Sequence, residues 1–225
     1  MIPFKDDNPT RHFPIVTIAL IAANIAVFIY QFLSPSDMQR IAYAYGAVPY
    51  SLVTFKSVQP VHPLITVLTS MFMHGGLLHL ASNMLYLWIF GNNIEDNLGY
   101  VKFILFYLLC GVVAAYAHAF TNPASTVPMI GASGAVSGIL GAYILLFPHA
   151  RIHTLLFFIF FVQTVRLPAI IVIGFWIGIQ FINGLISHGT ATHGGIAWFA
   201  HIGGFVFGIL TIKSFMRKKR RHPVY

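Results

Sequence analysis

The chain has 225 residues, of which 57% are apolar and only 8% are charged, and its mean hydropathy is +0.78. Soluble domains carry about 25% charged residues, so this composition excludes an ordinary soluble protein and favours a polytopic membrane protein. The formal net charge is +8. The basic residues lie mostly in short loops and in a tail, KSFMRKKRR, which is typical of a membrane anchor and disfavours a nucleic-acid partner.

Six apolar stretches predict membrane-spanning helices, because each is close to the length that a bilayer requires. The first, PIVTIALIAANIAVFIYQFL, is longer than a signal-peptide core, so we interpret it as a retained helix. A long loop, 34–76, separates it from the second. In chain order we expect the spans at residues 13–33, 77–92, 100–120, 131–147, 168–187 and 196–215.

The segment RIHTLLFFIFFVQTVRLP, residues 151–168, is apolar enough to suggest a seventh span. It is short before Arg166 and Pro168, so we interpret it as a loop or an interfacial strand. With six spans and a cytoplasmic N-terminus, only Arg40 and Lys56 of the thirteen basic residues fall outside, as the positive-inside rule favours. The cytoplasmic ones are Lys5, Arg11, Lys102, Arg151, Arg166, Lys213, Arg217, Lys218, Lys219, Arg220 and Arg221.

The predicted fold is therefore an all-α membrane protein, a bundle of six transmembrane helices with both termini in the cytoplasm. We divide the chain into a short N-terminal segment (1–12), one membrane domain (13–215) and a basic tail (216–225). A compact multi-pass chain without large appended domains is what we expect of a prokaryotic inner-membrane protein.

Polar residues inside membrane spans are costly, so each is a functional candidate. His79 and Asn83 lie four residues apart on one face of the second span, Ser133 begins the fourth within GASG, and His201 lies in the sixth within AHIGGFVFG. At a rise of about 1.5 Å per residue, all three groups lie about 18–22 Å from the cytoplasmic boundary. We expect them at one level of the membrane.

Glycines predict which helices approach closely. Two GxxxG motifs, one in the fourth span and one in the sixth, favour direct backbone contact between these helices. If their glycine faces meet, His201 reaches the same edge as Ser133. Each motif alone is more often a packing feature than a catalytic one, and the shared depth reverses those odds. The glycines that we expect around the site are Gly131, Gly134, Gly138, Gly204 and Gly208.

These residues suit acyl transfer. Ser133 can act as a nucleophile with His201 as its general base, while the backbone N–H of Ser133 and the side chains of His79 and Asn83 hold an oxyanion. All five acidic residues lie at segment ends or in loops, so we predict a Ser–His dyad. Loss of the orienting aspartate costs a triad enzyme about 10⁴-fold in turnover, so we expect a slow enzyme unless packing holds the histidine.

Metal chemistry is the main alternative, because the chain has eleven histidines. It has no HExxH motif and no acidic residue near a histidine pair, so we do not expect a metal site. Glu95 and Asp96, at the inner end of the second span, are expected to pair or cap there.

The same blocks resemble the rhomboid family of intramembrane serine proteases: SMFMHGGLLHLASNMLYLWIFG (70–91), GASG (131–134) and AHIGGFVFG (200–208), in this order. The resemblance implies Ser133 as nucleophile, His201 as base, and His79 and Asn83 on the oxyanion side. It also implies a six-helix bundle, a first loop lying partly in the membrane, and a water-filled cavity. The implied substrates are single-span membrane proteins, cut in or beside their transmembrane segment, and the resemblance implies that no cofactor is needed.

Two features depart from the family pattern. The first loop lacks a Trp-Arg pair, and Ser137 stands where some members place an aromatic ring on the catalytic histidine. Trp176 and Gln180 share a face of the fifth span, which family logic makes a possible lateral gate. Two other functions remain open, a non-catalytic relative that binds and escorts transmembrane clients and a histidine-lined ion pathway.

Overall fold

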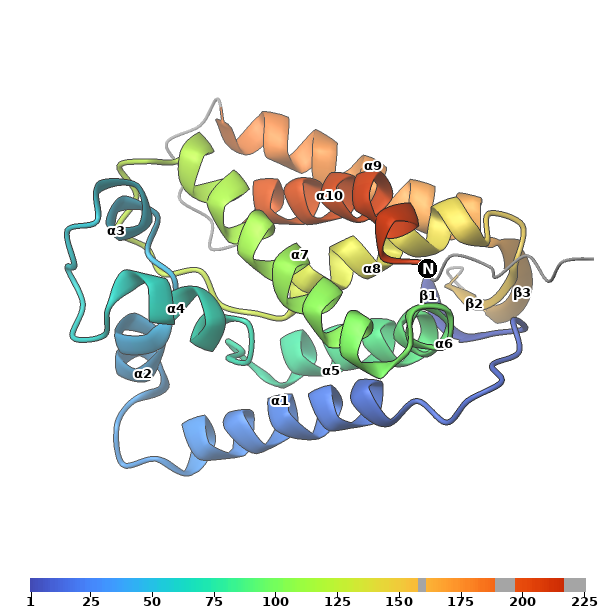
Figure 1. Ribbon diagram of the computed structural model, residues 1–225, viewed down its shortest axis with the longest axis horizontal. Helices are drawn as coiled ribbons and strands as arrows, with labels where there is room; N and C mark the ends of the chain where they lie inside the picture. The colour runs from blue at the N-terminus through green and yellow to red at the C-terminus, as the bar shows by residue number, and fades with distance from the viewer. Residues whose placement is uncertain (158–160, 189–196, 217–225) are drawn as a thin grey trace, which may run out of the picture.

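The computed structural model describes residues 1–157, 161–188 and 197–216. The structure is mostly helical, and helices form at all six predicted ranges (Figure 1). They are α1 (Ile15–Leu33), the continuous run of α5 (Leu77–Tyr86), η1 (Leu87–Gly91) and α6 (Asn92–Leu98), α7 (Tyr100–Thr121), α8 (Ser133–Leu146), α9 (Ala169–His188) and α10 (Trp198–Phe215). The segment η1 is a π-helical turn, which widens the helix locally.

Four helices in the described part of the chain are long and apolar enough to cross a membrane. They are α1, α7, α9 and α10, and α8 is a shorter apolar helix. Their outward faces carry many exposed large apolar side chains, as in Phe175 and Leu185 of α9. A water-soluble helix would bury such residues, so these faces are suited to contact with lipid.

The long first loop forms three short helices at one end of the bundle: α2 (Met38–Tyr45), α3 (Pro49–Thr54) and α4 (Pro63–Ser70). Its end is tied to α1 by Gln31, whose side-chain amide donates to the carbonyl of His74 (3.3 Å) and accepts from the N–H of the same residue (3.0 Å). Ala47 also exchanges backbone hydrogen bonds with Met129. These contacts anchor the loop without a Trp-Arg pair.

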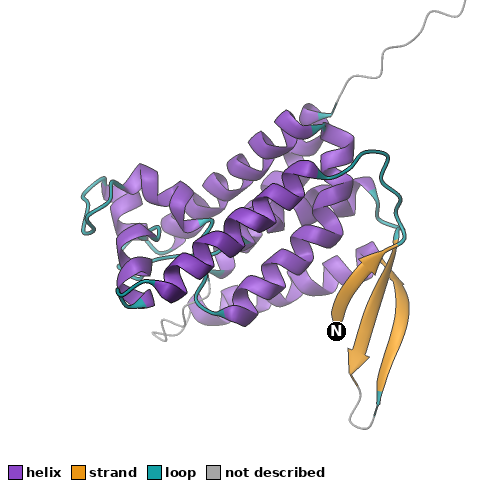
Figure 2. Cartoon of the chain, turned by 90° about the horizontal axis from the view of Figure 1, so that it is seen from below, coloured by secondary structure: helices purple, strands orange, loops and turns teal. Residues whose placement is uncertain are grey.

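A three-stranded antiparallel sheet corrects the all-α prediction. Its order is β1 (Ile2–Asp6), β2 (Arg151–Phe157), β3 (Val162–Pro168), and it projects from one end of the helices (Figure 2). The strand interpretation of segment 151–168 is confirmed for its described residues, and residues 158–160 lie outside them. The N-terminal segment contributes the third strand, in which Ile2 pairs with Leu155. A strand of five residues carries no periodic signal of its own, so only the pairing reveals it.

The centre of the bundle is a seam of glycines between α8 and α10. A methyl group added at Gly204 would overlap the carbonyl oxygen of Gly134, and one at Gly208 would overlap that of Gly138. Only glycine permits this backbone approach. The helix α7 closes the seam from the side, where Ala114 contacts Gly134 and Cys110 contacts Gly138.

Carboxylates hold the N-terminal end of α1. Glu95 accepts hydrogen bonds from the backbone N–H groups of Val16 (2.9 Å) and Thr17 (2.7 Å) and from the Thr17 hydroxyl (2.7 Å). These are the N–H groups that a helix start leaves without partners. Asp96 accepts from the backbone of His12 and contacts its ring at 2.7 Å. The predicted structural role of both acidic residues is therefore confirmed.

Candidate active site

Ser133 and His201 meet at the end of the glycine seam. Ser133 is the first residue of α8, His201 lies in the first turn of α10, and the serine Oγ lies 2.8 Å from the histidine Nε2. The contact follows from the seam, because His201 lies three residues before Gly204 on the same helical face. This distance allows a proton to pass from the hydroxyl to the imidazole.

The backbone before Ser133 is shaped for a close neighbour. Gly131 has φ +130°, a conformation that other residues rarely adopt, and its N–H bonds to the carbonyl of Ser70 at 2.9 Å. A Cβ at this position would lie 2.8 Å from Nε2 of His79. The glycine therefore lets the His79 ring lie against the turn that presents Ser133.

His79 and Asn83 project from α5 into the same cavity as Ser133 and His201. The Nδ1 of His79 accepts from the N–H of Gly75 at 3.3 Å, which leaves the Nε2 of His79 to carry the proton. The buried amide nitrogen of Asn83 has no hydrogen-bond partner among the described residues. Both side chains therefore have an N–H donor available to an anion in the cavity.

The cavity has a volume of about 800 Å³, within the range of small-ligand sites. Polar groups occupy one part of its wall, and apolar side chains make up most of the rest. The apolar lining comes from four parts of the chain and includes Leu77, Tyr86, Met129, Ile130, Trp176 and Trp198. The site is therefore suited to a peptide with apolar side chains and one polarised carbonyl.

The residues predicted as a possible gate lie beside His201. The ring of Trp176 is centred 5.7 Å from the His201 ring, and Oε1 of Gln180 lies 2.8 Å from its Nδ1. Trp198 approaches the ring edge-on at 6.3 Å. The aromatic neighbours thus come from α9 and α10, while Ser137 turns its hydroxyl back to the carbonyl of Ser133. The gate itself stays a prediction.

Sequence reasoning missed the contact between Gln180 and His201. A polar residue in a membrane span is a functional candidate by the rule that singled out His79 and Asn83. The signal was present, but the rotation of α9 decides whether Gln180 faces lipid or the site. The structure has only 5% of Gln180 exposed, which places its amide inside.

The sequence of the chain is similar to those of known proteins. The Rhomboid domain profile matches residues 62–218, which include all the site residues above. The chain is 30% identical to Rhomboid protein 1, mitochondrial, of Saccharomyces cerevisiae over 198 residues, covering 85% of this chain and 51% of the yeast protein. It is 30% identical to the human presenilin-associated rhomboid-like protein, mitochondrial, over 213 residues, covering 91% and 50%.

A shorter match has higher identity. The chain is 41% identical to Rhomboid protease GluP of Bacillus subtilis over 75 residues, which cover 33% of this chain and 14% of the bacterial protein. The chain thus spans about half the length of the yeast and human relatives and a smaller part of the bacterial one.

Proposed function

This chain belongs to the rhomboid family, and we propose that it is an intramembrane serine endopeptidase that cuts membrane-anchored proteins in or beside a transmembrane segment. The observation that carries the proposal is the 2.8 Å contact between Oγ of Ser133 and Nε2 of His201. These two atoms come from residues 68 positions apart in the chain. They lie in a cavity that also holds N–H donors of His79 and Asn83, for which no acceptor is found in the described part of the chain.

In the acylation step, Nε2 of His201 takes the proton of the Ser133 hydroxyl as its oxygen attacks the scissile carbonyl carbon. The resulting oxyanion accepts hydrogen bonds from His79, Asn83 and the backbone N–H of Ser133. The imidazolium then gives its proton to the leaving amine as the C–N bond breaks, which leaves an ester on Ser133. Water, deprotonated by His201, hydrolyses this ester and restores the hydroxyl. No cofactor takes part.

The substrate must expose its backbone to reach Ser133. A transmembrane helix satisfies its own carbonyl groups with internal hydrogen bonds, so the scissile segment has to unwind locally. Small or helix-weakening residues near the cut lower the cost of unwinding. Trp176 and Gln180 are on α9, and this helix is the proposed lateral entrance for single-span substrates.

The same proposal includes the arrangement in the membrane. Six spans and two cytoplasmic termini in a prokaryotic inner membrane put the basic loops on the cytoplasmic side. The described ends of the chain support this in part, because β1 and the end of α10 lie at the same end of the bundle (Figure 1). The basic tail from residue 217 onward lies outside the described residues.

The test is cleavage of a membrane-anchored reporter by the purified protein in liposomes. Wild type should release the soluble fragment, and Ser133→Ala should release none above background. Ser36→Ala is the matched control, because Ser36 is an exposed loop serine outside the cavity. Equal cleavage by wild type and Ser133→Ala would reject the proposal. A wild type that binds the reporter without cutting it would favour a non-catalytic escort.

A further inference from the structure

Gln180 supplies what the Ser–His pair lacks, a partner for the second nitrogen of the histidine. We propose that Gln180 is a positioning residue, which holds His201 in the tautomer and orientation that proton transfer from Ser133 requires. This role rests on the proposed function. It adds to the Ser–His pair a third residue, which orients the histidine.

The hydrogen bonds fix the direction of each group in turn. The amide nitrogen of Gln180 donates to the carbonyl of Trp176 at 3.1 Å, because a carbonyl can only accept. The amide oxygen, Oε1, therefore faces Nδ1 of His201 at 2.8 Å and must accept the proton there. With its proton on Nδ1, the neutral ring presents the lone pair of Nε2 to Ser133, at 2.8 Å.

The backbone carbonyl of Trp176 is the decisive element. In a Ser–His–Asp triad, replacing the aspartate by asparagine costs about 10⁴-fold, because the amide allows the wrong histidine tautomer. Here the preceding helical turn binds the amide nitrogen, so the oxygen is the end that is presented to the ring. A neutral amide can thus do the orienting work of a carboxylate without a charge inside the membrane span.

The surroundings leave no acidic substitute for this role. The five acidic residues are Asp6, Asp7, Asp37, Glu95 and Asp96, and none of them lines the cavity. Other titratable side chains with an electrostatic influence on His201 are His79 and His118. Trp176 and Trp198 restrict rotation of the ring, but neither aromatic contact selects a tautomer.

The first test variant is Gln180→Leu, which removes the acceptor at nearly constant volume. We expect kcat for the liposome reporter to fall about 10- to 10³-fold with KM nearly unchanged, because the loss affects only the proton-transfer step. Gln163→Leu is the matched control, since Gln163 is exposed on β3 at the far end of the molecule. It should retain wild-type kcat.

The second variant, Gln180→Glu, distinguishes positioning from simple packing. A carboxylate still accepts from Nδ1, so kcat should recover relative to Gln180→Leu. It also stabilises the imidazolium, so the acid limb of the pH–rate profile should move to higher pH by about one unit or more. Wild-type kcat in Gln180→Leu, or an unmoved acid limb in Gln180→Glu, would overturn the role. An inactive wild type would instead reject the proposed protease function.

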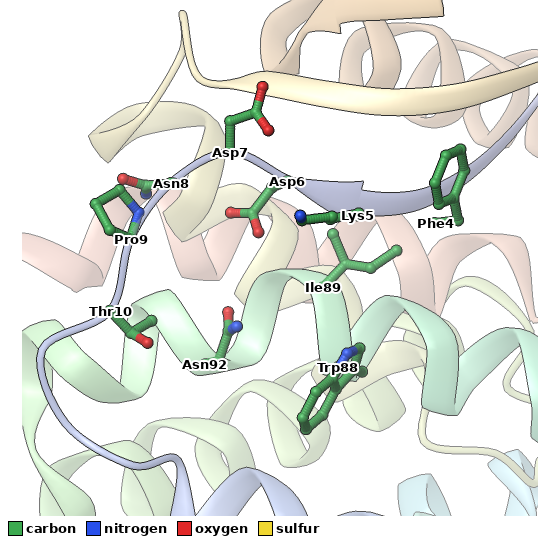
Figure 3. A pocket seen from close by; sticks show the side chains of 10 residues that line it. All are labelled: Phe4, Lys5, Asp6, Asp7, Asn8, Pro9, Thr10, Trp88, Ile89 and Asn92. Atoms are coloured by element: carbon green, nitrogen blue, oxygen red, sulfur yellow. The ribbon is translucent and has the colours of Figure 1, made fainter. Parts of the chain in front are cut away.

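The cavity beneath the N-terminal segment has features of a second binding site. Figure 3 shows it between residues 4–10 and one face of the α5–α6 helix, and its volume is about 610 Å³. Trp88, which is 48% exposed, forms one wall, while Lys5 and Asp6 come from the strand above it. Trp88 lies in η1, and a tryptophan beside charged residues is typical of the membrane–water boundary.

The charges of this cavity point to the headgroup. We infer that it binds a phospholipid whose headgroup carries an amine, phosphatidylethanolamine. The charge of Lys5 interacts with that of Asp7, which also lines the cavity. The ammonium group of Lys5 makes no hydrogen bond or ion pair within the described residues, so it is available to a phosphate. Asp6 accepts from the hydroxyl of Tyr143 at 2.7 Å, and its remaining acceptor sites can take an ammonium N–H.

Lipid retention measured by native mass spectrometry tests this site. The protein is exchanged into an equimolar mixture of phosphatidylethanolamine, phosphatidylcholine and phosphatidylglycerol with identical acyl chains. We expect retention to favour phosphatidylethanolamine about tenfold over phosphatidylcholine, which has no ammonium N–H to donate. Soluble phosphoethanolamine should not displace it, because the acyl chains contribute to binding; displacement would overturn the assignment to a lipid.

Two variants separate the contributions of the phosphate and the amine. Lys5→Gln should lower retention of every phospholipid, whereas Asp6→Asn, which still accepts from Tyr143, should remove only the preference for the amine. Lys56→Gln changes an exposed lysine of the first loop and is the charge-matched control. Equal retention of the three lipids by wild type, or a preference that survives Asp6→Asn, would overturn the site.

Discussion

Two of the helices that pack against α10, α8 and α9, differ in how closely they approach it. On the α8 side, the backbones touch, because Gly204 and Gly208 lie directly on the carbonyl groups of Gly134 and Gly138. On α9, no described atom lies within 4 Å of the position where a Cβ would stand at Gly174 or Gly178. The glycines of the seam thus mark close contact between α8 and α10, whereas Gly174 and Gly178 of α9 face open space.

This difference separates two parts of the proposed site. Ser133 and His201 lie on α8 and α10, so their distance is set by backbone contacts that leave no room for adjustment. Gln180 lies on α9, where neither Gly174 nor Gly178 is in close contact with a neighbouring backbone. We infer that α9 can move away to admit a substrate while the nucleophile and base stay in register. The hydrogen bond from His201 to Gln180 would reform when α9 closes.

The largest expected effect comes from closing the glycine seam. Gly208→Ala should destabilise the protein by about 3 kcal/mol or more and abolish reporter cleavage, because the new methyl group overlaps backbone of α8. Gly178→Ala adds the same methyl group to α9 and should be neutral or stabilise by up to about 1 kcal/mol. Thermal unfolding in detergent and reporter cleavage measure both. Similar losses in the two variants would show that α8 and α9 do not differ in how closely they pack against their neighbours.

The next largest effect is a loss of kcat, expected from a change on the oxyanion side of the cavity. Asn83→Ala removes a donor on α5 and leaves both the glycine seam and α9 unchanged. We expect kcat to fall about 10²- to 10³-fold with little change in unfolding temperature, since the Asn83 amide nitrogen has no described partner to lose. Steady-state kinetics in liposomes give the answer. An unchanged kcat would remove Asn83 from the site.

The opposite end of the molecule should affect stability without affecting the geometry of the site. Glu95→Gln weakens the bonds at the start of α1, and we expect a loss of about 1–3 kcal/mol in unfolding free energy. At temperatures well below unfolding, kcat should stay within about twofold of wild type. A large fall in kcat of the folded variant would show that this end, as well as the seam, holds Ser133 and His201.

The smallest effect concerns pH and the N-terminal strand. A hydrogen bond from His153 lowers the pKa of Asp7 below its ordinary value of 3.8. The contribution of the ionised Asp7 to holding β1 is therefore present above pH 3.8. It is lost as the pH falls through the lower pKa that Asp7 has in the folded state. Protection of the β1 amides against hydrogen exchange should stay constant from pH 7 to pH 5 and should fall only below the ordinary Asp7 pKa of 3.8. Asp7→Asn should exchange faster at pH 7, and an unchanged rate would contradict this role.

Much of this arrangement could be predicted from the sequence, because it follows from local signals. Apolar runs gave the six helix positions, and the two GxxxG motifs with a common depth predicted that His201 meets Ser133. The sheet could not be predicted in the same way, since Ile2 pairs with Leu155 across most of the chain and β1 has no pattern of its own. The orientation of Gln180 depends on the rotation of α9, which apolar composition on all sides leaves undetermined.

The most direct measurement is labelling of the folded protein with a fluorophosphonate probe, followed by identification of the modified residue. We expect a single adduct on Ser133 of wild type, no adduct in Ser133→Ala, and at least about 10³-fold slower labelling in His201→Ala, whose serine lacks its base. Labelling that persists in Ser133→Ala, or that proceeds at the wild-type rate in His201→Ala, would contradict the proposal that these two residues act as nucleophile and base.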